Sequence, residues 1–223
     1  MTSRLTHIRR LLKWGRVLAR HGALRGIEND RNAPAPVKRL CRVARFGAKQ
    51  GDEPDYAGAF GSIGPAAIKL GQALATRPDL VGEGPARNLL TLQDSLPPVD
   101  FALIRKRVEE SFERPLEEIF ATFEEQPIGA ASIAQVHHAL TTDGRDVAVK
   151  IQYPGIIDSI DSDLRNLSSL FQMGRVFLSK DRAKGLIEEV RNSILAEADY
   201  LSEAANLRRF ADIFCDWDHV RIP

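Results

Sequence analysis

The stretch from Pro127 to Gln152 constrains the fold more than any other part of this chain. Two runs rich in Val, Ile and Ala flank the dipeptide Asp143-Gly144. Both turn residues tolerate the positive φ of a tight hairpin turn, so the pattern predicts two antiparallel strands. Because side chains alternate along a strand, Ala148, Lys150 and Gln152 share one face of the second strand, and larger apolar residues occupy the other.

Lys150 stands in the middle of this apolar strand, where a charged side chain is costly unless it reaches a partner. The loop before the first strand indicates which partner. Gly129, Ala131, Ala134 and Val136 follow the register of the protein-kinase glycine-rich loop, G-x-G-x-x-G-x-V, with alanine at two glycine positions. Small residues let backbone N–H groups approach phosphate oxygens, and a lysine adds positive charge. Nucleotide binding is therefore favoured over an ordinary hairpin whose lysine extends into solvent.

Charge is distributed unevenly along the 223 residues. Residues 1–50 contain 13 Lys and Arg against Glu28 and Asp30, a net charge of +11, whereas the remainder carries 18 basic and 28 acidic residues, a net charge of −10. This asymmetry predicts a basic arm that faces an anionic surface. We expect no nucleic-acid partner, since the arm has few interleaved aromatic residues. Cys41 and Cys215 have neither disulfide-framework nor metal-site spacing, and no metal site is predicted in the chain.

Residues 3–22 have a helical period with two stripes. Such a helix is typical of an interfacial segment on anionic lipid, and equally of a helix that packs on its own domain. No apolar run is long enough to span a bilayer, and basic residues interrupt the N-terminus too often for a secretory signal. A soluble or peripheral chain is predicted. The apolar stripe consists of Leu5, Ile8, Leu11, Leu12, Gly15, Leu18 and Ala19, and the basic stripe of Arg9, Lys13, Arg16 and Arg20.

A largely apolar helix is predicted over residues 62–77. Lys69, Gln72 and Thr76 share one face at i, i+3 and i+7, and Gly71 allows a neighbour to approach closely. A polar stripe is usually the solvated side of a helix. Because this segment has few charges, we interpret the stripe as pointing at a polar site.

One long helix is predicted from about Arg182 to Asp212. It carries Glu197, Asp199 and Glu203, of which the last two are four residues apart and share a face. Carboxylates are common on exposed helices, but the two lysines singled out above need anionic partners if they are buried. Which carboxylate pairs with which lysine stays open.

Four segments, in order, resemble the signature motifs of the UbiB/ADCK (AarF-like) family of atypical kinases, and the likeness covers about residues 56–223. The resemblance implies an α+β fold: a protein-kinase-like N-lobe, which is a small antiparallel sheet with an αC-type helix, preceded by a helical extension, with the C-lobe absent. We expect a basic helical region at 1–50, the extension at 51–122, and an N-lobe at 123–223 that is cut before the hinge. The motifs are K-x-G-Q at 69–72, the alanine-rich loop Ala130-Ala131-Ser132, the strand lysine of Val147-Ala148-Val149-Lys150, and E-x-D at 197–199.

The resemblance also implies binding of ATP or ADP with Mg²⁺, ATPase or phosphotransferase activity, and a role in ubiquinone (coenzyme Q) biosynthesis. The implied partners are adenine nucleotide, an anionic membrane surface or lipid such as a quinone precursor, and other ubiquinone-biosynthesis proteins, at a cytoplasmic location peripheral to the inner membrane. Lys150 would hold the α- and β-phosphates, with Glu203 as its catalytic partner. Cofactor contacts would come from Gly129, Ala130, Ala131, Ser132, Val136 and Ala148, and regulatory contacts from Lys69, Gln72, Glu197 and Asp199.

The chain departs from a complete kinase after Lys150. It contains no H-x-D-x₄-N and no D-x-G, the motifs that supply the catalytic Asp, the Asn and the metal-binding Asp. Metal ligands are therefore expected beyond Pro223, and residues 1–223 are expected to catalyse weakly or not at all. Gly129 replaces the first alanine of the family's A-x-A-S loop, which should change its flexibility slightly. The alternative function is a non-catalytic module that binds nucleotide or lipid at a membrane surface.

Overall fold

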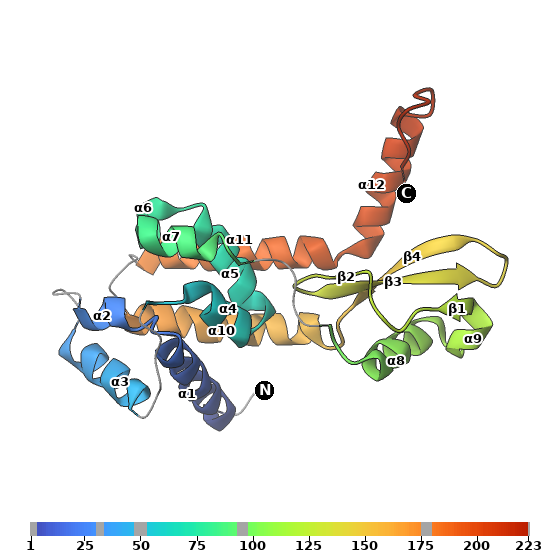
Figure 1. Ribbon diagram of the computed structural model, residues 1–223. Coiled ribbons are helices and arrows are strands. Elements are labelled where there is room, and N and C mark those ends of the chain that lie inside the picture. The colour runs from blue at the N-terminus through green and yellow to red at the C-terminus, as the bar shows by residue number, and fades with distance from the viewer. Residues whose placement is uncertain (1–3, 30–33, 47–52, 93–97, 175–179, 223) are drawn as a thin grey trace.

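The computed structural model describes residues 4–29, 34–46, 53–92, 98–174 and 180–222. Helices dominate both ends of the chain, and one small sheet lies between them (Figure 1). The helices before the sheet are α1 (Arg4–Arg20), α2 (Arg25–Asn29), α3 (Ala35–Arg45), α4 (Tyr56–Ile63), α5 (Pro65–Ala75), α6 (Pro78–Val81), α7 (Glu83–Leu89), α8 (Phe101–Phe112) and α9 (Leu116–Ile119). Those after it are α10 (Ile156–Gly174), α11 (Lys180–Ala198) and α12 (Tyr200–Ile213).

The sheet is antiparallel and has four strands, with β3 pairing with each of the other three. The predicted hairpin is present as β3 and β4, joined by a turn in which Gly144 has a φ of 85°. This positive φ is why glycine suits the position. The strands are β1 (Phe120–Phe123), β2 (Gly129–Ala130), β3 (Ala134–Thr141) and β4 (Asp146–Gln152).

The two faces of the sheet have different surroundings. Ala139 and Ile151 lie on the face that packs against Ile104 and Val108 of α8, and these four side chains are buried together. The opposite face carries Lys150 and its same-side neighbours, which are exposed or half-buried. The alternation of the strands thus creates one core face and one open face.

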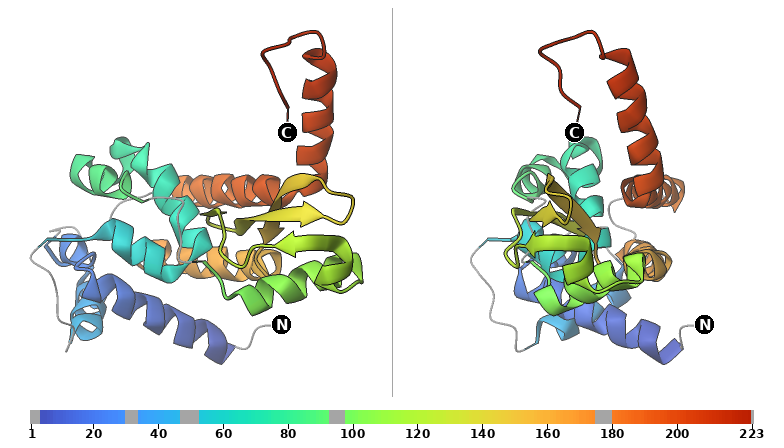
Figure 2. Two further views of the ribbon diagram at one scale, coloured as in Figure 1. Left: turned by 45° about the vertical axis from the view of Figure 1, so that its right-hand side comes forward. Right: turned by 90° about the vertical axis from the view of Figure 1, so that its right-hand side faces the viewer.

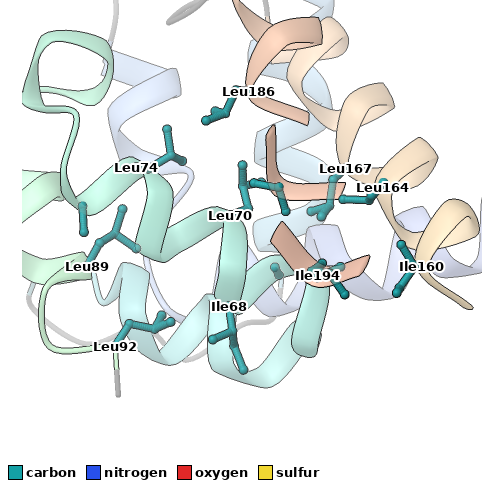
Figure 3. Close-up of a cluster of buried hydrophobic side chains, with 14 of the residues drawn as sticks. Ile68, Leu70, Leu74, Leu89, Leu92, Ile160, Leu164, Leu167, Leu186 and Ile194 are labelled. Atoms are coloured by element: carbon teal, nitrogen blue, oxygen red, sulfur yellow. The ribbon is translucent and has the colours of Figure 1, made fainter. Parts of the chain in front are cut away.

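A second, larger core holds the helices together. Leu70 of α5 and Ile194 of α11 are fully buried in it, and α10 lies alongside α11 (Figure 3). Ile133, from the loop between β2 and β3, belongs to this helical core and not to the core under the sheet. The loop therefore ties the sheet to the helical part of the molecule. The division into regions 1–50, 51–122 and 123–223 stays a prediction.

The predicted long helix from Arg182 to Asp212 is in fact two helices. The chain breaks at Asp199, and α12 leaves the end of α11 at a steep angle, so that its far end projects away from the rest of the molecule (Figure 2). The Asp199 side chain accepts hydrogen bonds from the backbone N–H and the hydroxyl of Ser202, at 3.0 and 2.7 Å. A capping aspartate offers the backbone an alternative to continuing the helix, which explains the break. Asp199 and Glu203 thus do not share a helical face.

Part of the apolar side of α1 packs on the protein itself, whereas Leu12 of the predicted apolar stripe is 58% exposed. Trp14 joins the large helical core, and Ala19 packs with Leu24 of the segment that follows and with Cys41 of α3. The side chains of Leu5 and Ile8 lie outside the described part. None of the helices in the described ranges combines the length and the apolar character needed to cross a bilayer.

Candidate functional site

An ion pair on the open face of the sheet forms the centre of the candidate site. The ammonium group of Lys150 donates to both carboxylate oxygens of Glu203 on α12, at Nζ–Oε1 3.0 Å and Nζ–Oε2 2.8 Å. The same nitrogen lies 4.9 Å from the centroid of the Tyr200 ring, which is within the range of a cation–π contact. The two charged side chains remain 42% and 48% exposed. A positive charge is thus held in a fixed place where a ligand can still reach it.

Asp199 sets the position of Glu203. As the N-cap of α12 it fixes the first turn of that helix, in which the backbone N–H of Glu203 donates to the Asp199 carbonyl at 3.1 Å. The side-chain hydrogen bond from Ser202 lowers the pKa of the Asp199 carboxyl, with a smaller contribution from the Ser202 backbone N–H. The E-x-D aspartate therefore acts here through backbone geometry, because no lysine pairs with it among the described residues.

A second ion pair joins the K-x-G-Q helix to the same segment. Lys69 Nζ lies 2.7 Å from Glu197 Oε1, with the lysine side chain 14% and the glutamate side chain 40% exposed. Gly71 faces the core: a Cβ at this position would meet Phe60 at 2.9 Å and Leu89 at 3.3 Å. The glycine of the motif is required by this close approach of neighbouring side chains. Gln72 is half-buried and also has an interaction within the structure.

The sequence left the pairing of lysines and carboxylates open, and the structure gives it. Lys150 pairs with Glu203, and Lys69 pairs with Glu197. Both carboxylates belong to the seven-residue segment around the α11–α12 junction, so this junction holds the strand lysine and the extension lysine at once.

The alanine-rich loop is anchored and does not form a free flap. Ser132 and Ile133 are buried, and the Ala131 N–H donates to the Ala134 carbonyl at 2.7 Å. Residues 129–134 all lie outside the positive-φ region, in keeping with alanine in place of glycine. Gly129 on β2 pairs with Val136, which in turn pairs with Lys150. Directly paired residues share a face, so the start of the loop and the lysine lie in one row across the open face.

Two residues of the site were missed by the sequence reasoning. Gln152 donates from Nε2 to the Ala198 carbonyl at the end of α11, at 3.4 Å, so a second side chain of β4 reaches the junction. The available signal was that Gln152 lies two residues after Lys150 and therefore on the same face of the strand. Tyr200 carries no comparable signal in the sequence. Burial raises the pKa of Tyr200 to about 12, with a further contribution from the nearby Glu203 charge.

The adjacent histidines on β3 have separate surroundings. His137 is buried and contacts the Glu124 carbonyl oxygen at 2.7 Å. His138 is on the open face and bridges the carboxylates of Glu124 (2.8 Å) and Asp146 (2.5 Å). These hydrogen bonds, first that of Glu124, raise the pKa of His138. In the described ranges, no group of three or more His, Cys, Asp and Glu is arranged to hold a metal ion.

A small antiparallel sheet, a strand lysine on its open face and a helix glutamate paired with it define the N-lobe of a protein-kinase-like protein. Residues 91–223 match the ABC1 atypical kinase-like domain. The chain belongs to this family of atypical kinases, to which the UbiB and ADCK-type proteins belong. The expected α+β fold is thereby confirmed.

Several curated relatives match most of the chain. "Probable protein kinase UbiB" of Shewanella baltica is 37% identical over 169 residues, covering 74% of this chain and 31% of the relative. The protein of the same name from Tolumonas auensis is 34% identical, covering 96% of this chain and 41% of the relative. "Protein ACTIVITY OF BC1 COMPLEX KINASE 8, chloroplastic" of Arabidopsis thaliana is 37% identical, covering 72% and 22%.

The chain spans less than half the length of these relatives. Among solved structures, that of Rv3197 with erythromycin, from Mycobacterium tuberculosis, is similar at 33% identity and a TM-score of 0.45. The match covers 73% of this chain and 42% of the Rv3197 chain.

Proposed function

We propose that this chain binds ATP or ADP, with Mg²⁺, on the open face of its sheet, as the nucleotide-binding part of a UbiB-type atypical kinase or ATPase that supports ubiquinone biosynthesis. The observation that carries the proposal is the ion pair of Lys150 with Glu203, held on an exposed sheet face beside the alanine-rich loop. The names of the UbiB relatives support the link to ubiquinone.

Each part of the open face has a role in this proposal. Lys150 holds the α- and β-phosphates as a point charge, and Glu203 keeps its ammonium group aimed at them. Val136 and Ala148 share the open face with the lysine and offer a small apolar surface to the adenine. Gly129, Ala130, Ala131 and Ser132 line the edge of the face from which the loop enters the core.

The K-x-G-Q helix has a regulatory role in the proposal. Lys69 reaches the same junction as the strand lysine, through Glu197, and Gln72 lies on the same helix. A change in this helix would therefore move α12 and Glu203. Mg²⁺ would neutralise the phosphates, and we expect its protein ligands beyond Pro223.

Titration calorimetry of the purified chain with Mg²⁺ and ADP tests the proposal. Lys150→Met should weaken binding by about tenfold or more, because a hydrogen bond to a charged group is worth about 1.5–3 kcal/mol. The matched control is Lys106→Met, which removes an exposed lysine from α8 on the other side of the sheet and should leave affinity unchanged. Equal affinities of wild type and Lys150→Met would refute the assignment.

ATP hydrolysis by the chain should be slow or absent, and rapid Mg²⁺-dependent turnover would contradict the expectation that essential catalytic groups lie elsewhere.

A second candidate function is association with an anionic membrane surface. The basic stripe of α1 favours it, because its four side chains are exposed while Trp14 and Ala19 of the same helix pack inside the protein. Co-sedimentation with phosphatidylglycerol-containing vesicles should decrease at high salt, because a surface attraction is screened. Binding that is equal with pure phosphatidylcholine vesicles would contradict an electrostatic attachment. The stripe consists of Arg9, Lys13, Arg16 and Arg20.

A further inference from the structure

The outward face of α3 carries a row of large apolar side chains. Cys41 packs with α1 on the inner side of this helix and is buried. Leu40, Val43 and Phe46, at i, i+3 and i+6 around the helix end, are 42%, 72% and 94% exposed. Single exposed apolar residues are ordinary, but a row of three on one face of a helix marks an interaction surface.

Positive charge flanks this row. Arg39 and Arg42 are exposed, and helical spacing places each of them one turn before a member of the row, Val43 and Phe46. Neither arginine forms an ion pair with a residue in the described ranges. Arg45, in contrast, is held by Glu28 at 2.7 Å and belongs to the internal packing. The outward face of α3 thus carries both large apolar side chains and cationic ones.

We propose that this face of α3 docks on an anionic lipid bilayer, with the three apolar side chains entering the boundary between headgroups and acyl chains and the two arginines pairing with lipid phosphates. A helix with such a mixed basic and apolar face is suited to lie in the plane of a membrane interface. Three side chains expose a few hundred Å² at most, well below the roughly 800 Å² per partner of a stable protein interface. A bilayer requires only shallow insertion, so the small area fits lipid better than it fits a protein partner.

The neighbouring helix α1 adds a second basic surface beside the apolar row of α3. α1 packs against α3, with the Cβ position of Gly15 4.0 Å from Ala44, and its basic stripe is exposed together with Leu12. We infer that the basic stripe of α1 attracts the chain to the membrane at long range, and that the apolar row of α3 then inserts into it. The proposal deepens the membrane association proposed above, and it is independent of nucleotide binding at Lys150.

The test uses the full chain and vesicles of phosphatidylcholine with or without phosphatidylglycerol. Substituting Leu40, Val43 and Phe46 together by serine should weaken binding to the anionic vesicles by about tenfold or more, since three apolar side chains lose their transfer from water. Arg39→Gln with Arg42→Gln should weaken it by about fivefold per charge and reduce the salt dependence. The matched control is Leu90→Ser at the end of α7, an equally exposed apolar side chain that should have no effect.

A depth measurement separates insertion from a change in the fold. Phe46→Trp, in a Trp217→Phe background in which the remaining Trp14 is buried, should be quenched by brominated acyl chains in anionic vesicles. Absence of quenching, or unchanged vesicle binding by the triple serine variant, would overturn the assignment to α3. A triple variant that converts a dimer to a monomer without affecting vesicle binding would show that the face contacts a second copy, which also overturns it. Unchanged ADP affinity in all these variants is expected.

Discussion

The two lysine–glutamate pairs should differ in strength although their distances are nearly equal. At such distances, two unit charges attract by about 1.5 kcal/mol at the dielectric constant of water and about four times more at an effective constant of 20. Lys150 and Glu203 are both more than a third exposed, so solvent screens their attraction and a coupling of about 0.5 kcal/mol is expected. Lys69 is largely buried beside a half-exposed Glu197, and this pair should couple by about 1.5 kcal/mol.

Double-mutant cycles in urea unfolding measure both couplings. Each lysine is replaced by Met and each glutamate by Gln, singly and together, and the difference from additivity gives the pair energy. The exposed pair Arg87–Glu83 on α7 is the control and should couple by about 0.3–0.5 kcal/mol. In 1 M salt the Lys150–Glu203 coupling should fall more than that of Lys69–Glu197. Equal couplings, or a stronger Lys150–Glu203 pair, would refute the argument that burial of the extension lysine decides the order.

Three further outcomes follow from local geometry. Gly129→Ala should stabilise the chain by about 0.4–1 kcal/mol, because a Cβ there would meet open space and φ is not positive. Gly144→Ala should destabilise it by about 1 kcal/mol, because φ is 85° at this position; urea unfolding measures both changes. The pKa of His138 measured by NMR should lie above its ordinary value, so the stability that its charge contributes is full below about pH 6.5 and is lost as the pH rises through the raised pKa. Glu124→Gln should lower the pKa of His138, and an unaltered titration would contradict the hydrogen bond between the two side chains. Tyr200→Phe should retain ADP affinity and stability, because the buried hydroxyl has no hydrogen-bond partner among the described residues. Tyr200→Leu should weaken ADP binding through the lost contact of the ring with Lys150, and equal effects of the two substitutions would exclude a role of the ring.

Local chemistry made the sheet predictable and the helix break unpredictable. The hairpin follows from Asp143-Gly144 and the alternation of the flanking strands, which act over short distances. The break at Asp199 interrupts a segment that continues with good helix formers on both sides, so periodicity alone predicted one helix. The signal was the capping aspartate with Ser202 three residues later, which is informative only once the helix end is known.

The sequence predicted which residues belong to the candidate site, but it did not predict which lysine pairs with which carboxylate. Lys150 and Glu203 are 53 residues apart in the sequence, and the choice between Glu197 and Glu203 depends on how α12 turns away from α11. The exposed row on α3 was hidden for a related reason. Its Leu, Val and Phe look like core residues in a basic helix until packing shows that the opposite side of α3 is the buried one.

The measurement that tests the central claim most directly is a map of backbone amide chemical shifts as Mg²⁺ and ADP are added to the isotopically labelled chain. Shifts should concentrate at the β2 end and loop (129–136), on the open-face positions of β4 around Lys150, and at the first turn of α12, with little change on α8 behind the sheet. Saturating nucleotide that leaves these amides unmoved, or moves mainly those of α8, would contradict binding at the open face.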